Sequence, residues 1–453
     1  MQRSKSRWIG DRQFYRTALA VGIPLMFQQL ITSSVNLVDN LMVGQLGNEA
    51  LSGVAAVNRF TMIAIFAVNG LLAAAAIFIA QFWGAEDSER MKQTFRFSLL
   101  AAGLILIPFW LAEALAPALI LGFFTNVPEV VAAGSRYMVM AAWTLPPTAL
   151  SLTAASAMRA AGEPRLPLVI SASAVLINTL LNYVLIFGQF GFPALGVQGA
   201  ALATVIARLM EAALYLYFLK RRPFAFKTRL CDLFSIPRSL AWTIFKKALP
   251  LALNELMWSL GMATLFKFYS QRGPEVMAGY SIANTISDLF FVLFGGLATA
   301  TTILVSKPLG ADRMEEARDR AYQLLAFAVF LAVLFSFLMF GSSFVVPSWY
   351  QVSTQAKQIA TQMLRVMAVM FWTYTANTQC YFILRAGGDT RSTLFVDSGF
   401  MWLINLPLIG MLTYFTGLNI MQMYLIGQMT ELAKLALAYH LVRKEEWLVN
   451  LTE

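Results

Sequence analysis

Asp39 is the side chain in this sequence whose type and position most clearly suggest chemistry. It lies in the largely apolar run from Val35 to Asn40, with Asn36 about one helical turn earlier on the same face. An ionisable group at the centre of a membrane-spanning helix costs about 2.5–3.5 kcal/mol or more, so it needs a partner or a role. We expect Asp39 to be a cation-coupling residue that takes up and releases a proton. A carboxylate among the outer lipid headgroups is the alternative.

Further polar side chains inside apolar segments could form a cavity around such a carboxylate. Asn178 and Asn182 are four residues apart and share a helical face, so with Asn36 and Asp39 they could build one polar patch. Hydrogen bonding between helices would explain the two asparagines equally well. The other candidates for a substrate or polar cavity, each with a structural role as the alternative, are Glu255, Asp288, Asp397, Tyr374 and Asn377.

The sequence lacks the residues that most enzymatic chemistry needs. Its two cysteines, Cys231 and Cys380, are too few for a disulfide framework or a thiolate metal site. Its single histidine, His440, has no second imidazole to work with. No Gly-rich loop ends in Lys-Ser or Lys-Thr, so nothing indicates ATP hydrolysis. We therefore expect no enzyme, no metal site and no cofactor.

The elements that must position these side chains are long apolar helices. Of 453 residues, 58% are hydrophobic and only 13% are charged, about half the charged share of a soluble protein, so the chain is an integral membrane protein. A bilayer core needs about 20 apolar residues per helix, and barrel strands are far shorter than the runs seen here. The runs predict an all-α fold of twelve transmembrane helices near residues 17–44, 50–80, 95–120, 129–155, 166–190, 195–219, 243–270, 276–305, 321–346, 356–384, 393–416 and 419–442.

Lys and Arg residues gather in alternate loops, and this asymmetry predicts the orientation in the membrane. They concentrate in the N-terminal tail, in every second short loop, in a linker at 220–242 and at the C-terminal end. The tail lacks the apolar core of a cleaved signal peptide. We expect both termini and the linker in the cytoplasm, and the chain in a bacterial plasma membrane. The net charge of +10 follows from this topology, so no nucleic-acid partner is expected.

The two halves of the sequence repeat each other at an offset of 226 residues. Four blocks between Pro24 and Arg165 match blocks between Pro250 and Arg391, and beyond them one residue is inserted in the second half. Six crossings return the chain to the side of the membrane where it started, so the second bundle begins on the same side as the first. We therefore expect the two bundles to have the same orientation, related by a pseudo-twofold axis along the membrane normal. The expected domains are an N-terminal bundle at 1–219, the basic linker at 220–242 and a C-terminal bundle at 243–453.

Three segments resemble motifs of the multidrug and toxic compound extrusion (MATE) family. The segment Val38–Gly47 resembles the family's helix 1 signature, Asn178–Tyr183 is similar to its helix 5 motif, and Leu384–Arg391 resembles its loop between helices 10 and 11. The likeness spans both halves. It implies a two-lobe antiporter that works by alternating access and exports hydrophobic or cationic drugs, or other toxic organic compounds, in exchange for H⁺ or Na⁺.

The resemblance implies coupling to protons at Asp39. This residue matches the helix 1 carboxylate that such proteins use for coupling, and its repeat partner is Leu265, so the duplicated fold itself does not need a carboxylate there. A helix 7 Glu and a helix 10 Asp of NorM-like, often Na⁺-linked members fall on Trp258 and Tyr374. The chain is therefore expected to be closer to DinF-like, proton-coupled members. Glu255, one turn before Trp258, keeps Na⁺ coupling open.

Two other classes of protein are alternatives to an antiporter. A flippase for a lipid-linked substrate should hold phosphate with several Arg or Lys, and these spans contain few cations besides Arg208, Lys267 and Lys434. A membrane-embedded enzyme would need a nucleophile and a base, which the sequence does not bring together. The expected partners are small-molecule drugs or organic cations and membrane lipid, and we expect a monomer.

Overall fold

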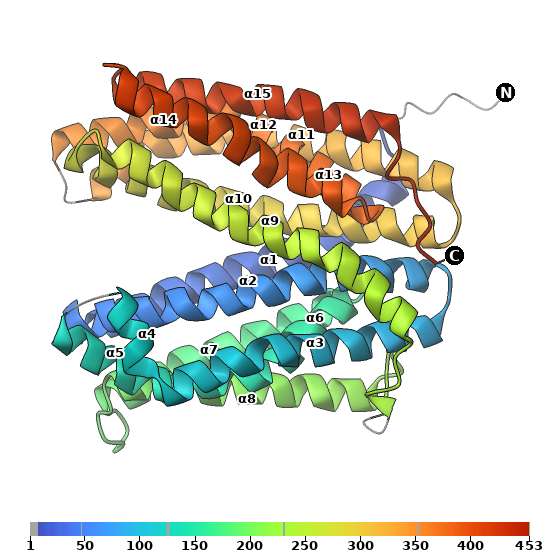
Figure 1. Cartoon of the computed structure of the whole chain (residues 1–453), viewed down its shortest axis with the longest axis horizontal. Helices are drawn as coiled ribbons and strands as arrows, with labels where there is room; N and C mark the ends of the chain where they lie inside the picture. Colours follow the sequence, from blue (N-terminus) through green and yellow to red (C-terminus); the bar gives the residue numbers. More distant parts are fainter. Residues whose placement is uncertain (1–7, 47, 125–126, 230–231, 351–352, 453) are drawn as a thin grey trace. The chain divides into compact units, whose positions relative to one another are not determined.

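The computed structural model describes the chain apart from residues 1–7, 47, 125–126, 230–231, 351–352 and 453 (Figure 1). Inside helices, the side chains at 32, 34–41, 44, 48–49, 51, 124, 270 and 274 also lie outside the described part. Asn36 and Asp39 belong to this group. Their backbone is part of the first helix, but their side chains lie outside the described residues.

Among the described residues, a long helical segment lies on each of the twelve expected spans, and the short helices α4 and η3 accompany them, which confirms the all-α prediction. The fourth segment joins α5, η1 and α6, and the eleventh joins α13, two π-helical pieces η4 and η5, and α14. The first half contains α1 (Arg12–Gly44), α2 (Asn48–Gly84), α3 (Ser88–Leu115), α4 (Pro117–Phe124), α5 (Pro128–Ala141), η1 (Ala142–Thr144), α6 (Leu145–Ala160), α7 (Arg165–Phe187) and α8 (Val197–Arg221). The second half contains α9 (Arg238–Ser270), α10 (Pro274–Gly310), α11 (Met314–Val345), η3 (Val346–Trp349), α12 (Thr354–Ala386), α13 (Thr390–Leu394), η4 (Phe395–Gly399), η5 (Met401–Asn405), α14 (Leu406–Phe415) and α15 (Ile420–Lys444).

Matching helices of the two halves have matching lengths. The first helices, α1 and α9, each have 33 residues and a proline inside, at Pro24 and Pro250. The second helices, α2 and α10, each have 37 residues, and the last helices, α8 and α15, each have 25. The sequence repeat is therefore also a repeat of secondary structure.

Contacts group the chain into two compact units. The N-terminal unit is Phe27–Ala252, and the C-terminal unit consists of Met1–Met26 together with Leu253–Glu453. The halves expected at 1–219 and 243–453 describe the duplication of the sequence, whereas this grouping follows packing. It divides α1 and α9 at equivalent places, two residues after each helix's proline.

Two glycines at equivalent positions of the repeat let the first helix of each half, α1 or α9, pack closely on α10 or α2, respectively. A Cβ at Gly296 of α10 would collide with the backbone of Met26, and a Cβ at the equivalent Gly70 of α2 would collide with the backbone of Ala252. Glycine at a helix interface allows two backbones to approach each other. The start of α1 therefore packs on α10 within the C-terminal unit, and the start of α9 packs on α2 within the N-terminal unit.

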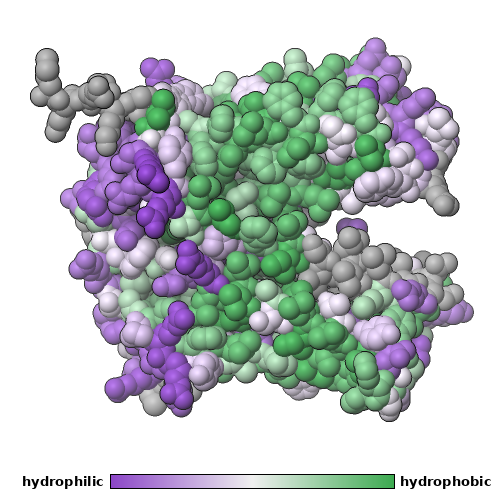
Figure 2. Space-filling model, turned by 180° about the vertical axis from the view of Figure 1, so that it is seen from behind, coloured by the Kyte–Doolittle hydropathy of each residue, from purple (hydrophilic) through white to green (hydrophobic). Residues whose placement is uncertain are grey.

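The core of each unit surrounds its second helix. Of the eight helices among the described residues that are long and apolar enough to cross a membrane, α2 and α10 are the most buried. In the C-terminal unit, α10 packs on α12 through an edge-to-face contact between Phe294 and Phe371, whose ring centroids are 5.0 Å apart. On the face shown in Figure 2, each unit taken by itself carries a broad band of hydrophobic residues, with hydrophilic residues at its ends. This pattern suits a chain that spans a membrane.

Candidate functional site

Each unit contains a cluster of polar side chains contributed by its first, fourth, fifth and sixth membrane helices. In the N-terminal unit, the cluster consists of Gln28, Arg159, Ser171, Arg208 and Glu211, which we call the N-terminal cluster. Gln28 donates from Nε2 to Ser171 Oγ at 3.2 Å and accepts from Arg159 at 3.4 Å. Ser171 donates to Glu211 at 3.3 Å, and Arg208 forms an ion pair with Glu211 at 2.7 Å.

The C-terminal cluster is centred on Asn254, which lies at the repeat position of Gln28. Its Nδ2 donates to Tyr381 OH at 3.3 Å and to Asp397 Oδ2 at 3.1 Å. Its Oδ1 accepts from the backbone N–H of Ser398 at 3.2 Å and from the Ser398 hydroxyl at 2.6 Å. Arg385, the repeat partner of Arg159, donates to Tyr381 OH at 3.2 Å. All four hydrogen-bonding positions of the buried Asn254 amide are thus filled.

An ion pair closes this cluster on its α15 side. The Lys434 ammonium lies 2.7 Å from Asp397 Oδ1, and the two side chains are only 15% and 22% exposed. Asn377 of α12 donates to Glu431 Oε2 at 2.9 Å. Glu431 lies on α15, about one helical turn before Lys434. Glu431 also interacts electrostatically with Lys434. We include Asn377, Glu431 and Lys434 in the C-terminal cluster.

The inserted residue of the second half lies in the π-helical part of its fifth membrane helix. The repeat offset grows by one between Arg391 and Ile404, and the residues 395–399 and 401–405 are π-helical. A single extra residue in an α-helix is accommodated as a π-turn, and such turns are frequent at functional sites. The matching helix of the first half, α7, is a regular α-helix and presents Ser171 to Gln28. The π-turn presents both Asp397 and Ser398 to Asn254.

The structure brings two of the expected N-terminal site residues together. Asn178 and Asn182 are 5% and 1% exposed, and Asn182 donates to Asn178 at 3.4 Å. Asn178 also donates to Thr204 of α8 at 3.3 Å. The other two members of the expected patch are Asn36 and Asp39, and their side chains lie outside the described residues.

Four of the five expected residues of the second half lie in or next to the C-terminal cluster, among them Asp397, which contacts Asn254 and Lys434. Glu255 is half-buried and interacts electrostatically with Arg385 and Asp397. Asn377 belongs to the cluster itself, and the Tyr374 hydroxyl donates to Gln428 of α15 at 2.7 Å. Asp288 is exposed on α10 and is not part of it.

The sequence alone did not single out two carboxyl groups inside the bundles, the half-buried Glu431 and the buried Glu113. Glu431 is identified by the hydrogen bond that Asn377 donates to it. Glu113 of α3 is 0% exposed, accepts one hydrogen bond from Thr61 at 2.7 Å, and its Oε2 has no hydrogen-bond partner among the described residues. The repeat did carry a signal for the clusters, because Gln28 with Asn254 and Arg159 with Arg385 match at the offset of 226.

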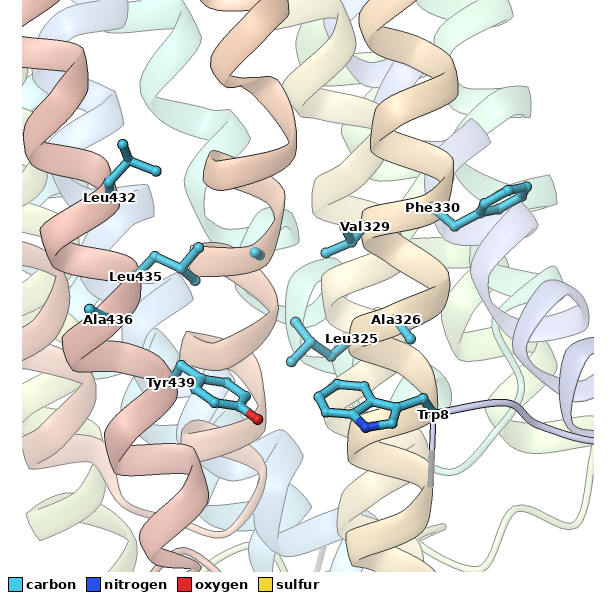
Figure 3. A pocket seen from close by; sticks show the side chains of 10 residues that line it. Trp8, Leu325, Ala326, Val329, Phe330, Leu432, Leu435, Ala436 and Tyr439 are labelled. Atoms are coloured by element: carbon cyan, nitrogen blue, oxygen red, sulfur yellow. The ribbon is translucent and has the colours of Figure 1, made fainter. Parts of the chain in front are cut away.

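A groove in the C-terminal unit offers a different environment, with a volume of about 660 Å³. Its lining is apolar apart from the Trp8 indole and the Tyr439 hydroxyl, and Leu325 and Val329 of α11 face Leu435 of α15 across it (Figure 3). Such a surface can accept alkyl groups, and no charged side chain lines it. In the part of the chain that the structure describes, no set of three His, Cys, Asp or Glu side chains could hold a metal ion.

Twelve helices in two repeated bundles, with polar clusters inside each bundle, define a membrane transport protein. Residues 24–184 and 250–411 match the family described as MatE, and the chain belongs to this family of multidrug and toxic compound extrusion (MATE) transporters. It is 28% identical to a probable multidrug resistance protein NorM from Bradyrhizobium diazoefficiens, over 88% of this chain and 87% of the relative. It is 25% identical to the multidrug resistance protein MdtK of Yersinia pestis, over 88% of each chain.

Solved structures confirm the fold. An outward-facing multidrug resistance MATE family transporter matches with a TM-score of 0.86 at 19% identity, over 94% of this chain and 96% of the other. A MOP superfamily transporter from Pyrococcus furiosus matches with a TM-score of 0.84 at 20% identity, over 96% of each chain. The protein is thus an all-α integral membrane protein of twelve transmembrane helices in two homologous six-helix bundles.

Proposed function

We propose that this protein is a secondary antiporter that exports hydrophobic or cationic drugs, or other toxic organic compounds, in exchange for protons. The observation that carries the proposal is the match to the MatE family over both halves of the chain. The named relatives are multidrug resistance proteins. Asp39 lies within the matched region, in the segment Val38–Gly47 that resembles the family's helix 1 signature.

Asp39 is the proposed coupling residue. An ionised carboxylate attracts a cationic drug, and a proton arriving from outside the cell removes that attraction by neutralising it. Drug and proton then compete for overlapping states, which exchange requires. Pro24 lies inside α1 and has no N–H for the helical ladder, so the segment after it can bend when the charge on Asp39 changes. The buried Asn178 and Asn182 pair supports the proposal as a polar surface on the neighbouring α7.

Drug binding to purified protein at several pH values tests this assignment. We expect wild-type affinity to fall on acidification, by up to about tenfold per pH unit once the carboxyl group binds a proton in the free state. Asp39→Asn should bind with an affinity that does not vary with pH, and proteoliposomes containing it should show no efflux driven by ΔpH. An Asp39→Asn protein that keeps both the pH dependence and ΔpH-driven efflux would refute the role of Asp39.

The driving ion is tested with the same proteoliposomes. Efflux is measured under an imposed ΔpH and under an imposed Na⁺ gradient, one at a time. The proposal expects the ΔpH alone to drive export. Export driven only by Na⁺ would identify the same antiport with Na⁺ as the coupling ion, and transport of a lipid-linked substrate without either gradient would favour a flippase.

A further inference from the structure

The sixth membrane helices of the two units carry equivalent charges of opposite sign. An offset of 223 residues aligns Arg208 with Glu431 and Glu211 with Lys434. The same offset aligns the basic ends Lys220–Arg221 and Arg443–Lys444, which fixes the register. Where the N-terminal unit places a carboxylate against its fifth membrane helix, the C-terminal unit places an ammonium.

The neighbours of these two residues differ accordingly. Glu211 accepts from the Ser171 hydroxyl of α7, whereas Lys434 pairs with the Asp397 carboxylate of η4. Asp397 has this position because the extra residue of the π-turn adds a second side chain next to Ser398. The C-terminal unit has therefore gained both a carboxylate and the cation that neutralises it.

Lys434 occupies a place that is rich in oxygen ligands. Asp397 Oδ1 contacts its ammonium at 2.7 Å, and the Glu431 carboxylate interacts with it electrostatically. Asn377 is 4% exposed and bonded to Glu431 through Nδ2, and its Oδ1 has no hydrogen-bond partner among the described residues. Carboxylate and amide oxygens are the ligands that hard cations prefer. The charged and titratable groups around the site are Glu255 on α9, Tyr381 and Arg385 on α12, Asp397 on η4, and Glu431 on α15.

We propose that Lys434 is the resident cation of the C-terminal unit and determines its ion specificity, because its ammonium occupies the position that a free Na⁺ would otherwise take between Asp397, Glu431 and Asn377. The tethered ammonium offsets the charge of one carboxylate and fills the space beside Asp397, which weakens the attraction for a second cation and leaves it no room. Under this proposal, the N-terminal unit with Asp39 carries out proton coupling. The proposal deepens the proposed antiport and rests on it for its physiological meaning, but its test needs no transport.

The test is the thermal stability of purified full-length protein in NaCl and in choline chloride at equal ionic strength. Wild type should melt at the same temperature in both salts. Lys434→Ala should be stabilised by Na⁺ by about 2–4 °C at saturation, since a ligand that binds only the folded state raises the melting temperature. Lys434→Arg, which keeps a cation at the site, is the matched control and should show no Na⁺ effect. Lys434→Ala combined with Asp397→Asn should lose the effect, because the carboxylate ligand is gone.

Three outcomes would overturn the proposal. They are an equal Na⁺ effect in wild type, no Na⁺ effect in a folded Lys434→Ala protein, and an Na⁺ effect that persists when Asp397→Asn is added. If Lys434→Ala folds in neither salt, Lys434→Gln takes its place and the same outcomes apply. Folding of Lys434→Ala only when Na⁺ is present during purification would support the proposal. The pH dependence of drug binding at Asp39 is measured separately, so failure of one proposal is distinguishable from failure of the other.

Discussion

Arg208 and Lys434 illustrate how single charged residues are accommodated in the apolar helices of this protein. Each forms an ion pair at 2.7 Å, with Glu211 and Asp397 respectively. A charge left unpaired inside a membrane is costly, and removing one partner of a buried pair exposes that cost. Carboxylates that already have a basic partner are therefore less suited to exchange protons during transport than a carboxylate without one.

This reasoning gives a prediction for Glu255. We expect Glu255→Gln to retain most of the ΔpH-driven drug efflux, because Glu255 lies among the compensated charges near Arg385 and Asp397. Asp39→Asn should lose it. Both variants are measured in proteoliposomes at matched protein content. Equal loss of efflux in both would mean that the C-terminal unit shares the coupling step.

At the scale of one element, the eleventh helical segment shows how one inserted residue changes a site. In α7, the regular helix provides Ser171 as a partner of Gln28. In the π-helical segment, Asn254 has two, Asp397 and Ser398. The repeated helix thus presents an additional carboxylate, Asp397, to the cluster while it keeps its position within the bundle.

Helix packing gives a second prediction, at two adjacent glycines of α10. Gly296→Ala should destabilise the protein by about 1–3 kcal/mol, because the new methyl group meets the backbone of Met26, which cannot move aside like a flexible side chain. Gly295→Ala is the matched control, since a Cβ there meets nothing within 4 Å. It should leave stability unchanged or raise it by about 0.5–1 kcal/mol. The thermal unfolding of the two purified variants checks this, and equal destabilisation would contradict the close approach of α1 and α10.

At the scale of the whole molecule, the duplication and the distribution of charge predict the orientation. We expect the two six-helix bundles to have the same direction, which would place both termini and the linker on one side of the membrane. The excess of Lys and Arg on that side predicts that it is the cytoplasmic side. Two residues of the linker, Thr228 and Ser235, bind to Arg96 of α3. The Arg96 guanidinium donates to the Thr228 hydroxyl at 2.6 Å and to the Ser235 carbonyl at 3.1 Å, so the linker is attached to the basic end of the N-terminal unit.

A protease site inserted within 223–235 tests this orientation. We expect cleavage in inside-out vesicles and none when protease is added to intact cells. An uncleaved chain in both preparations would call for a second insertion at the C-terminal end, after Lys444, which is expected on the same side. Cleavage from outside intact cells would overturn the topology, and with it the assignment of the proton's entry side.

The sequence by itself determined the number of membrane helices and their approximate positions, their duplication and the family, because these depend on the length of apolar runs and on residues compared at a fixed offset. Pro24 with Pro250 and Arg159 with Arg385 could be matched without coordinates. Only the tertiary structure decided which polar residues meet. The bond from Asn254 to Asp397 joins residues 143 apart, and Lys434 completes the pair from another helix. Such contacts depend on helix rotation and on a π-turn, and a one-residue change of register moves a side chain by about 100° around a helix.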